Sequence, residues 1–367
     1  VGDIDFKSWK YDKVTAMRQP GSTFKLFVYT EAMNQGLTPC DKRRDEYFSM
    51  QVFDKTQNKE VTWAPTNANG YFTGDSIPLK AAFARSINSV AVRLGQEMGI
   101  NRIAETAHKM GIESPLDETP ALALGSSDIN LLELANAYST IANDGKYVKR
   151  QLVTRILDRN GKEVYKSSIS EEQVIPYKSA FLMQQLLMGG TREPGGTSMS
   201  LNGYVGNFRD TDWGGKTGTS NNHSDAWFMG VSPNLVVGAW VGGEYRCIHF
   251  RTGALVQGSR TALPICGYFL EAVLKDPAFS KYRVKFGKPK DADITSSMYN
   301  CSSYAPRAKA DTLRRDSISI EEEIILDEDG NPVERQHPTK SPSNEEKSEP
   351  AATHKKAKEE AVNFDNL

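Results

Sequence analysis

The 367-residue sequence contains no long apolar run, and this absence argues against a membrane span within it. No stretch approaches the roughly 18 consecutive apolar residues that a transmembrane helix requires. The N-terminus also lacks the basic segment followed by an apolar one that marks a signal peptide. Because the chain starts at Val1 rather than at Met, we expect that an upstream targeting or anchoring segment is missing.

An excess of charge of either sign is also absent. The 45 Lys and Arg residues nearly balance the 46 Asp and Glu residues, so the net charge is -1. Without an overall positive field, binding to nucleic acid or to an anionic membrane surface is not expected. His108, His223 and His249 are isolated, and no Cys-x-x-Cys pair is present. We therefore expect neither a metal site nor a cofactor.

Cysteine is scarce, with only Cys40, Cys247, Cys266 and Cys301, and these four are widely scattered. Four cysteines allow three pairings, and the sequence does not choose among them. A domain of this size has enough core to be stable without a covalent cross-link. We therefore expect buried or free thiols rather than a structural disulfide.

The composition changes near Pro306, which predicts a domain boundary. Beyond it, Lys, Glu, Asp, Ser and Pro predominate and aromatic residues almost disappear, so a packed core cannot form there. We predict one folded domain over residues 1–305 and a disordered, charged tail over residues 306–367.

Helical and strand patterns both occur in the folded part. Residues 22–33 follow a Pro-Gly turn and are predicted to form a buried helix that begins at Ser22. Further helices are predicted at residues 86–98, 101–110 and 129–143. Two β-rich runs joined by Ser-Pro-Asn predict a hairpin, at residues 226–231 and 235–241, with residues 214–220 as a third antiparallel strand. The predicted fold class is α+β, an antiparallel sheet flanked by helices with an inserted helical subdomain.

Three short segments carry residue types of nucleophilic catalysis: Ser-Thr-Phe-Lys at 22–25, Ser-Ile-Asn at 86–88 and Lys-Thr-Gly at 216–218. On a helix, residues i and i+3 share a face, so Lys25 can place its amine beside the Ser22 hydroxyl. An amine whose pKa is lowered by burial and by a second cation can take the serine proton. Lys216 is the candidate second cation, and its charge would also attract a substrate carboxylate.

The strand predicted around Lys216 offers further binding groups. Thr217 and Thr219 share one face of it because side chains alternate, and both hydroxyls can hold a carboxylate or a peptide. Gly218 between them lets a substrate backbone come close. Ser22, at a helix start, lies near unpaired backbone N–H groups that favour a developing oxyanion.

Each segment alone also has a structural interpretation. An isolated Ser-x-x-Lys is commonly a surface helix turn, Ser86 would cap the helix that follows it, and Lys-Thr-Gly is commonly a turn or a strand end. Two other motifs are excluded, because Asp210 stands where a phosphate-binding loop needs glycine and Pro20 where a lipase-type nucleophile elbow does. The joint occurrence of the three segments in this order favours a catalytic site.

With their flanks, the segments resemble the transpeptidase motifs of class A, bifunctional penicillin-binding proteins. The resemblance rests on RQPGSTFK at 18–25, ARSINS at 84–89 and GKTGTS at 215–220, with support at 123–125, 142–145, 195–197 and 225–228. It implies a fold of the penicillin-binding and serine β-lactamase type. It also implies a peptidoglycan D,D-transpeptidase, with stem peptides as D-alanyl-D-alanine donor and amine acceptor and β-lactams as covalent inhibitors.

Carried over residue by residue, the resemblance implies a role for each motif residue. Ser22 would attack the D-alanyl-D-alanine carbonyl, and Lys25 would be the base. Ser86 would relay a proton between Lys216 and the leaving amine, and Asn88 would hold the substrate amide. Backbone N–H groups of Ser22 and of the threonine after the Lys-Thr-Gly motif would form the oxyanion hole.

Members of the family carry two sheet strands, a membrane anchor and a glycosyltransferase domain upstream of the serine motif, whereas only 21 residues precede Ser22 here. We therefore expect the N-terminal strands of the sheet to be missing, with at most the end of one at residues 1–6, and we assign this chain no glycosyltransferase activity. The parent protein is expected to be membrane-anchored and to work in the periplasm, on the extracytoplasmic face of the inner membrane.

Two alternatives stay open. Water could resolve the acyl-enzyme, as in a D,D-carboxypeptidase or a β-lactamase, or the protein could be a β-lactam-binding sensor or scaffold without turnover. Glu133 with Asn136 faintly resembles a deacylating glutamate, but their apolar helical surroundings favour a structural role. His223, close to the lysine strand, is likewise predicted to be a surface or structural residue.

Overall fold

A three-stranded antiparallel sheet lies at the centre of the protein in a computed structural model, which describes residues 11–54, 57–220 and 222–306. The strand order is β11-β10-β9, and β10 pairs with both neighbours. Its strands are β9 (Gly214–Thr219), β10 (Asp225–Ser232) and β11 (Leu235–Gly242). The predicted hairpin and third strand are confirmed.

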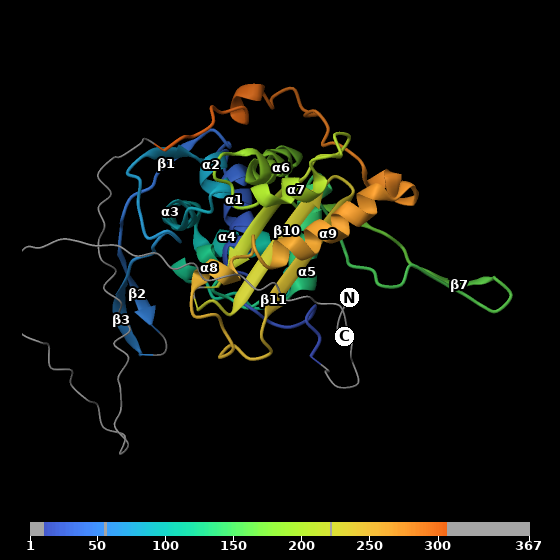
Figure 1. The fold of residues 1–367 in the computed structure, drawn as a ribbon, viewed down its shortest axis with the longest axis horizontal. Helices are drawn as coiled ribbons and strands as arrows, with labels where there is room; N and C mark the ends of the chain where they lie inside the picture. Colours follow the sequence, from blue (N-terminus) through green and yellow to red (C-terminus); the bar gives the residue numbers. More distant parts are fainter. Residues whose placement is uncertain (1–10, 55–56, 221, 307–367) are drawn as a thin grey trace, which may run out of the picture. The chain divides into compact units, whose positions relative to one another are not determined.

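Both faces of this sheet are covered, because the side chains of β10 alternate between two hydrophobic clusters. Trp227, Met229 and Val231 belong to the larger cluster, and Phe228 belongs to the smaller one. Figure 1 shows α9 (Ala262–Lys275) crossing one face of the sheet, with α1, α5 and α6 on the other. All eight residues of β10 are therefore buried.

The chain between the first helix and the sheet contains the other helices of the predicted helical subdomain. The longer helices are α1 (Lys25–Asn34), α3 (Asn88–Met98), α4 (Ile100–Lys109), α5 (Leu131–Ala142) and α6 (Tyr177–Arg192). Short helices are α2 (Leu79–Ala84), α7 (Asn202–Val205) and α8 (Gly253–Val256), and 3-10 turns are η1 (Gly21–Phe24), η2 (Pro120–Leu124), η3 (Met199–Leu201), η4 (Pro277–Tyr282) and η5 (Ser296–Met298). No helix in the described ranges is long and apolar enough to span a bilayer.

Four small antiparallel pairs decorate this helical part, and the sequence patterns did not predict them. They are β1 (Lys42–Arg44) with β4 (Ser76–Pro78), β2 (Met50–Asp54) with β3 (Lys59–Trp63), β5 (Lys146–Val148) with β8 (Glu171–Gln173), and β6 (Arg155–Leu157) with β7 (Glu163–Lys166). The β1 and β4 pair matters most for the site, because α2 begins directly after β4.

Helix α1 is enclosed on all sides, and this sets the polarity around the first predicted motif. Every residue from Lys25 to Met33 is buried, and α1 packs against α3, α4 and α6. A helix that is buried on every side belongs in a core. The lysine at its first position is therefore held in a medium of low dielectric constant.

The expectation of free or buried thiols is wrong for two of the four cysteines. Cys40 and Cys301 form a disulfide with their Cα atoms 5.2 Å apart, whereas Cys247 and Cys266 are free. The reason is local, because residues 299–304 run beside α2 without belonging to a helix or a strand. A few polar contacts hold them, such as the bond from the Tyr304 hydroxyl to the Asp75 carboxylate at 2.7 Å. The disulfide joins this segment covalently to the chain just before β1.

Two predictions fall on residues that the structure does not describe. The expected remnant of a sheet strand at residues 1–6 lies outside the described ranges, and so does the expected disordered tail beyond Pro306. Both stay predictions.

Candidate active site

The three predicted segments meet at one cleft with a volume of about 340 Å³. Its lining includes Ser22, Ser86, Asn88, Thr217, Gly218 and Thr219. Lys25 and Lys216 are 0% and 1% exposed, and both bond to the Ser86 hydroxyl. The predicted convergence of these sequence-distant residues is therefore present.

Ser22 lies in the first turn of η1, which is held against the end of β9. The turn is closed by Thr23, whose backbone N–H and hydroxyl both donate to the Pro20 carbonyl. Gly21 has a φ of +52°, and a Cβ there would lie 2.6 Å from the Thr219 carbonyl oxygen. Only glycine permits this approach. Since the first N–H groups of a helix have no partner within it, the Ser22 N–H is available to a ligand.

A second backbone donor comes from Thr219. The Ser220 N–H donates to the Asp225 carbonyl at 3.0 Å, which makes this a hydrogen-bonded pair of the β9 and β10 ladder. Antiparallel pairs alternate, so the next residue, Thr219, directs its N–H away from β10 and towards η1. The N–H groups of Ser22 and Thr219 thus come from facing segments, as an oxyanion site requires.

Lys25 is bonded to the segment between α2 and α3. Its Nζ donates to the Ser86 carbonyl at 2.8 Å, to Asn88 Oδ1 at 2.6 Å and to Ser86 Oγ at 3.3 Å. Burial, and then the charge of Lys216, lower the pKa of Lys25 well below its ordinary value. The direct contact predicted with Ser22 is not made, because no hydrogen bond among the described residues joins Lys25 Nζ to that hydroxyl. Proton transfer requires the neutral amine to turn from these acceptors.

Lys216, in the middle of β9, is the second buried amine. Its Nζ donates to Ser86 Oγ at 2.9 Å and to the Thr217 carbonyl at 2.8 Å, and it lies 5.8 Å from the centre of the Phe83 ring. Burial lowers the pKa of Lys216 to about 7. Near neutral pH this amine can therefore either give or take a proton.

Ser86 is held in an unusual backbone conformation, with φ at +60°. The left-handed region is costly for residues other than glycine, and such strain concentrates at functional sites. The interpretation of Ser86 as a helix cap is wrong, because Ile87 is the N-cap of α3 and the Ser86 side chain bonds to the two lysines.

Asn88 is the first residue of α3, and its side chain lies between the amine of Lys25 and Thr66, which also lines the cleft. Its Oδ1 accepts from Lys25, and its Nδ2 donates to the Thr66 carbonyl at 2.8 Å. An amide nitrogen has two N–H groups, so the Thr66 bond leaves a second one for a substrate carbonyl.

The threonines of β9 present hydroxyls to the cleft, as predicted. Thr217 Oγ1 donates to Thr197 Oγ1 at 2.7 Å, and Thr219 Oγ1 accepts from the Gly258 N–H at 3.4 Å. Gly218 has a packing role that the sequence did not predict, because a Cβ there would lie 2.4 Å from the Pro20 carbonyl oxygen. Its absent side chain makes room for η1. The predicted approach of a substrate backbone to Gly218 stays a prediction.

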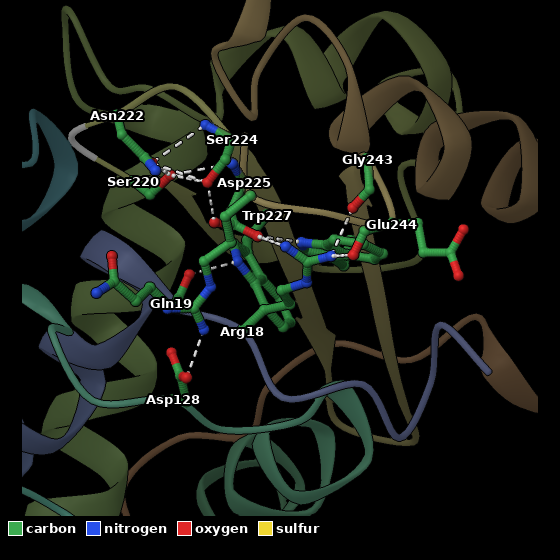
Figure 2. Close-up of polar contacts among 12 residues, drawn as sticks. Arg18, Gln19, Asp128, Ser220, Asn222, Ser224, Asp225, Trp227, Gly243 and Glu244 are labelled. Carbon is green, nitrogen blue, oxygen red and sulfur yellow. Dashed lines mark hydrogen bonds and ion pairs between the residues drawn. The ribbon is translucent and has the colours of Figure 1, made fainter. Parts of the chain in front are cut away.

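Arg18 and Asp225 anchor the turn before Ser22, and the sequence analysis assigned neither of them a role. Figure 2 shows the Arg18 guanidinium bonded to the carbonyls of Gly243 and Glu244. Its Nη1 also lies 3.9 Å from Asp225 Oδ1, which accepts from Trp240 Nε1 at 2.9 Å. Arg18 is 2% exposed and Asp225 is 1% exposed, so this ion pair is protected from solvent screening. Arg18 is the first residue of the RQPGSTFK motif, and this position was the feature of the sequence that could have indicated its role.

Comparison with known proteins decides the family. A family model described as the penicillin binding protein transpeptidase domain matches residues 3–239. The chain belongs to this family. The resemblance predicted from the motifs is thereby confirmed.

Curated relatives of this transpeptidase domain are longer proteins. It is 32% identical over 250 residues to penicillin-binding protein 2D of Bacillus subtilis, which covers 66% of this chain and 34% of that protein. It is 31% identical over 310 residues to penicillin-binding protein 1A of Rickettsia felis, which covers 77% of this chain and 37% of that protein. The chain thus spans about a third of the length of these relatives.

Solved structures agree with the fold assignment. Penicillin-binding protein 1A of Haemophilus influenzae is 26% identical, with a TM-score of 0.68, over 76% of this chain and 45% of that one. PonA1 of Mycobacterium tuberculosis, solved in complex with penicillin V, is 23% identical with a TM-score of 0.58, over 72% of this chain and 71% of that one. The predicted penicillin-binding type of α+β fold is confirmed.

Two further candidates are placed by the structure of the transpeptidase domain. Glu133 accepts from the Ser114 hydroxyl at 2.7 Å and from Asn130 Nδ2 at 2.6 Å, and it is not among the residues that line the cleft. This agrees with the predicted structural role. His223 lines the cleft and has a φ of +60°, so it lies closer to the site than its predicted surface role implied.

Proposed function

We propose that this chain is a peptidoglycan D,D-transpeptidase domain that works through a Ser22 acyl-enzyme and is acylated by β-lactams. The observation that carries the proposal is the pair of buried amines, Lys25 and Lys216, which meet at the Ser86 hydroxyl beside the cleft that Ser22 lines. A serine in a cleft that such amines border has the parts of an activated nucleophile.

Acylation follows from these parts. Ser22 Oγ attacks the carbonyl carbon of the penultimate D-alanine while the neutral amine of Lys25 takes the hydroxyl proton. The N–H groups of Ser22 and Thr219 stabilise the negative charge on the carbonyl oxygen. That electron pair then returns and breaks the C–N bond. The departing D-alanine amine takes a proton from the Ser86 hydroxyl, and Lys216 donates a proton to Ser86 in turn.

Deacylation repeats the chemistry with a new nucleophile. The amine of a second stem peptide attacks the carbonyl carbon of the Ser22 ester and gives up a proton to one of the two lysine amines. The C–O bond to Ser22 then breaks, and Ser22 Oγ takes a proton back from Lys25. Before the D-alanine leaves, Asn88 holds the donor amide, and the hydroxyls of Thr217 and Thr219 hold the donor's terminal carboxylate near the charge of Lys216. The partners are thus stem peptides as donor and acceptor, with no cofactor required.

This chemistry needs access to the cell wall, so we place the parent protein at the extracytoplasmic face of the inner membrane. The length of the relatives, about three times the matched part, is compatible with an upstream anchor and a glycosyltransferase domain in the parent protein. Neither is assigned to this chain.

A labelled penicillin tests the proposal directly. The wild-type chain and a Ser200→Ala control, which removes an exposed serine away from the cleft, should form a covalent adduct, and Ser22→Ala should form none. Incubation with a D-alanyl-D-alanine peptide, with and without an added amine, then separates the outcomes. An amide product supports transpeptidation, and hydrolysis of the peptide alone would indicate a carboxypeptidase. Turnover of the labelled penicillin to its hydrolysed form would indicate a β-lactamase, and an adduct without any turnover would indicate a sensor or scaffold.

A further inference from the structure

A buried carboxylate outside the cleft is hydrogen-bonded to the residues around the start of α3. Asp45, in the link between β1 and β2, is 1% exposed. Within the described ranges no ion pair neutralises it. Its charge is instead satisfied by neutral donors: Ser89 Oγ at 2.6 Å, Asn67 Nδ2 at 2.7 Å, and Thr73 N and Oγ1 at 2.9 and 3.0 Å. A buried charge of this kind is tolerated only because it is fully hydrogen-bonded.

The carboxylate determines which way the Asn67 amide points. An ionised carboxylate only accepts hydrogen bonds, so it selects the Nδ2 end of the amide. The Tyr71 carbonyl, 2.9 Å from the same nitrogen, selects that end as well. Asn67 Oδ1 must then face the other way, towards the start of α3.

At that place α3 lacks a cap of its own. Its N-cap residue, Ile87, has no polar side chain. Asn67 Oδ1 accepts instead from the N–H groups of Asn88 and Ser89, at 2.9 and 3.2 Å. An asparagine oxygen at such N–H groups does the work of an N-cap, supplied here by a residue 21 positions upstream.

The same loop also holds the side chain of Asn88. The Thr66 carbonyl, from the residue next to Asn67, accepts from Asn88 Nδ2, which leaves Asn88 Oδ1 directed at Lys25 Nζ, 2.6 Å away. A continuous path of hydrogen bonds, none longer than 2.9 Å, therefore runs from Asp45 through Asn67 and Asn88 to the amine of Lys25.

We propose that Asp45, acting through Asn67, is a positioning residue for acyl transfer, which orients Asn88 and the amine of Lys25. The proposal rests on the proposed function, because it concerns the same reaction. Asp45 does not line the cleft and touches no reacting atom. Its effect on the reaction comes from the geometry that it imposes on the groups that do.

The test compares Asp45→Asn with Ser89→Ala by acylation rate and thermal unfolding. Asp45→Asn keeps the shape but replaces one acceptor of Asn67 Nδ2 with an amide that can also donate, so of the two acceptors only the Tyr71 carbonyl still selects that end of Asn67. Ser89→Ala removes a donor to the same carboxylate oxygen and leaves the Asn67 cap intact. Both should lower the melting temperature. Only Asp45→Asn should slow acylation by a labelled penicillin, by about tenfold or more, since misplacement by about 1 Å can cost about a hundredfold.

A second variant, Asn67→Ala, tests the proposal if Asp45→Asn does not fold. Asn67→Ala removes the relay and leaves the carboxylate its bonds from Ser89 and Thr73, and it should slow acylation to a similar extent. Acylation by Asp45→Asn or Asn67→Ala at the rate of Ser89→Ala would overturn this proposal alone, with the proposed function intact. An unlabelled wild-type protein would overturn both.

Discussion

Lys25 and Lys216 donate to the same oxygen, the Ser86 hydroxyl, at 3.3 and 2.9 Å. Two ammonium groups this close repel one another in a buried site, so the pair holds one proton more readily than two. With both amines beside it, Ser86 can pass a proton between either of them and a group in the cleft. The assignment of Lys25 as base and Lys216 as charged partner agrees with the causes of the two shifts, because the charge of Lys216 adds to burial in lowering the pKa of Lys25, whereas burial lowers the pKa of Lys216.

Replacement of the proposed base by a permanent cation should stop acylation without removing the positive charge. Arginine cannot be deprotonated in a protein, so Lys25→Arg keeps a donor for the Asn88 oxygen but has no lone pair for the Ser22 proton. We expect acylation by a labelled penicillin to slow by about 10²–10⁴-fold, the usual contribution of a general base. Thermal unfolding checks that the variant is folded, and a folded Lys25→Arg that acylates at the wild-type rate would exclude Lys25 as the base.

The charge of Lys216 should give the reaction a descending limb at alkaline pH. Burial lowers the pKa of Lys216 to about 7, so the amine is charged below this pH and neutral above it. As the pH rises through about 7, the attraction for a substrate carboxylate is lost and the second-order acylation rate constant should fall. Lys216→Arg stays charged, so its profile should lack this limb even if its rate is lower throughout. A descending limb of the same midpoint in Lys216→Arg would assign it to another group.

Gly218 should tolerate no side chain, because of packing rather than backbone freedom. A Cβ at this position would lie 2.4 Å from the Pro20 carbonyl oxygen, a backbone atom that cannot move without shifting η1. We expect Gly218→Ala to lower the free energy of unfolding by about 1–3 kcal/mol and to slow acylation by moving Ser22. Gly203→Ala is the control, since a Cβ there meets nothing within 4 Å, and helix propensity predicts a gain of up to about 1 kcal/mol. Equal stability and rates in both variants would contradict the packing argument.

Loss of the disulfide should cost stability more than activity. The bond closes a loop of 261 residues, and removal of a native disulfide commonly costs about 2–5 kcal/mol. Cys301→Ser should therefore lower the melting temperature, whereas Cys247→Ser, which replaces an exposed free thiol, should leave it unchanged. Thiol titration of the denatured, unreduced wild-type protein should find two reactive groups, and four would show that the bond is absent.

The sequence predicted those parts of the site whose chemistry is local. The alternation of Thr217 and Thr219 on one strand follows from strand geometry alone, and the structure agrees with it. The spacing of Ser22 and Lys25 placed both residues at the start of the first helix, although Ser22 lies in the 3-10 turn η1 and Lys25 begins α1. The hairpin of β10 and β11 was equally accessible, because its apolar runs and its turn residues adjoin in the chain.

Contacts between distant residues could not be found in this way. Asn67 caps α3 from a loop that has no periodic pattern. The ion pair of Arg18 and Asp225 joins residues that lie far apart in the sequence. Ser86 does not take the capping role that its motif would have in isolation, because two buried amines from other elements donate to its hydroxyl. In each case tertiary packing determines the hydrogen-bond or ion-pair partner, which local propensity does not predict.

The cross-link between Cys40 and Cys301 also constrains the order in which the protein matures. Cys40 cannot form its native disulfide while the helical subdomain and the sheet are synthesised, because Cys301 follows it by 261 residues. Pairs among Cys247, Cys266 and Cys301 would enclose much shorter loops, which close more readily. Cys266, on the buried face of α9, is withdrawn from this competition once α9 packs on the sheet, which leaves the exposed Cys247 as the competing thiol.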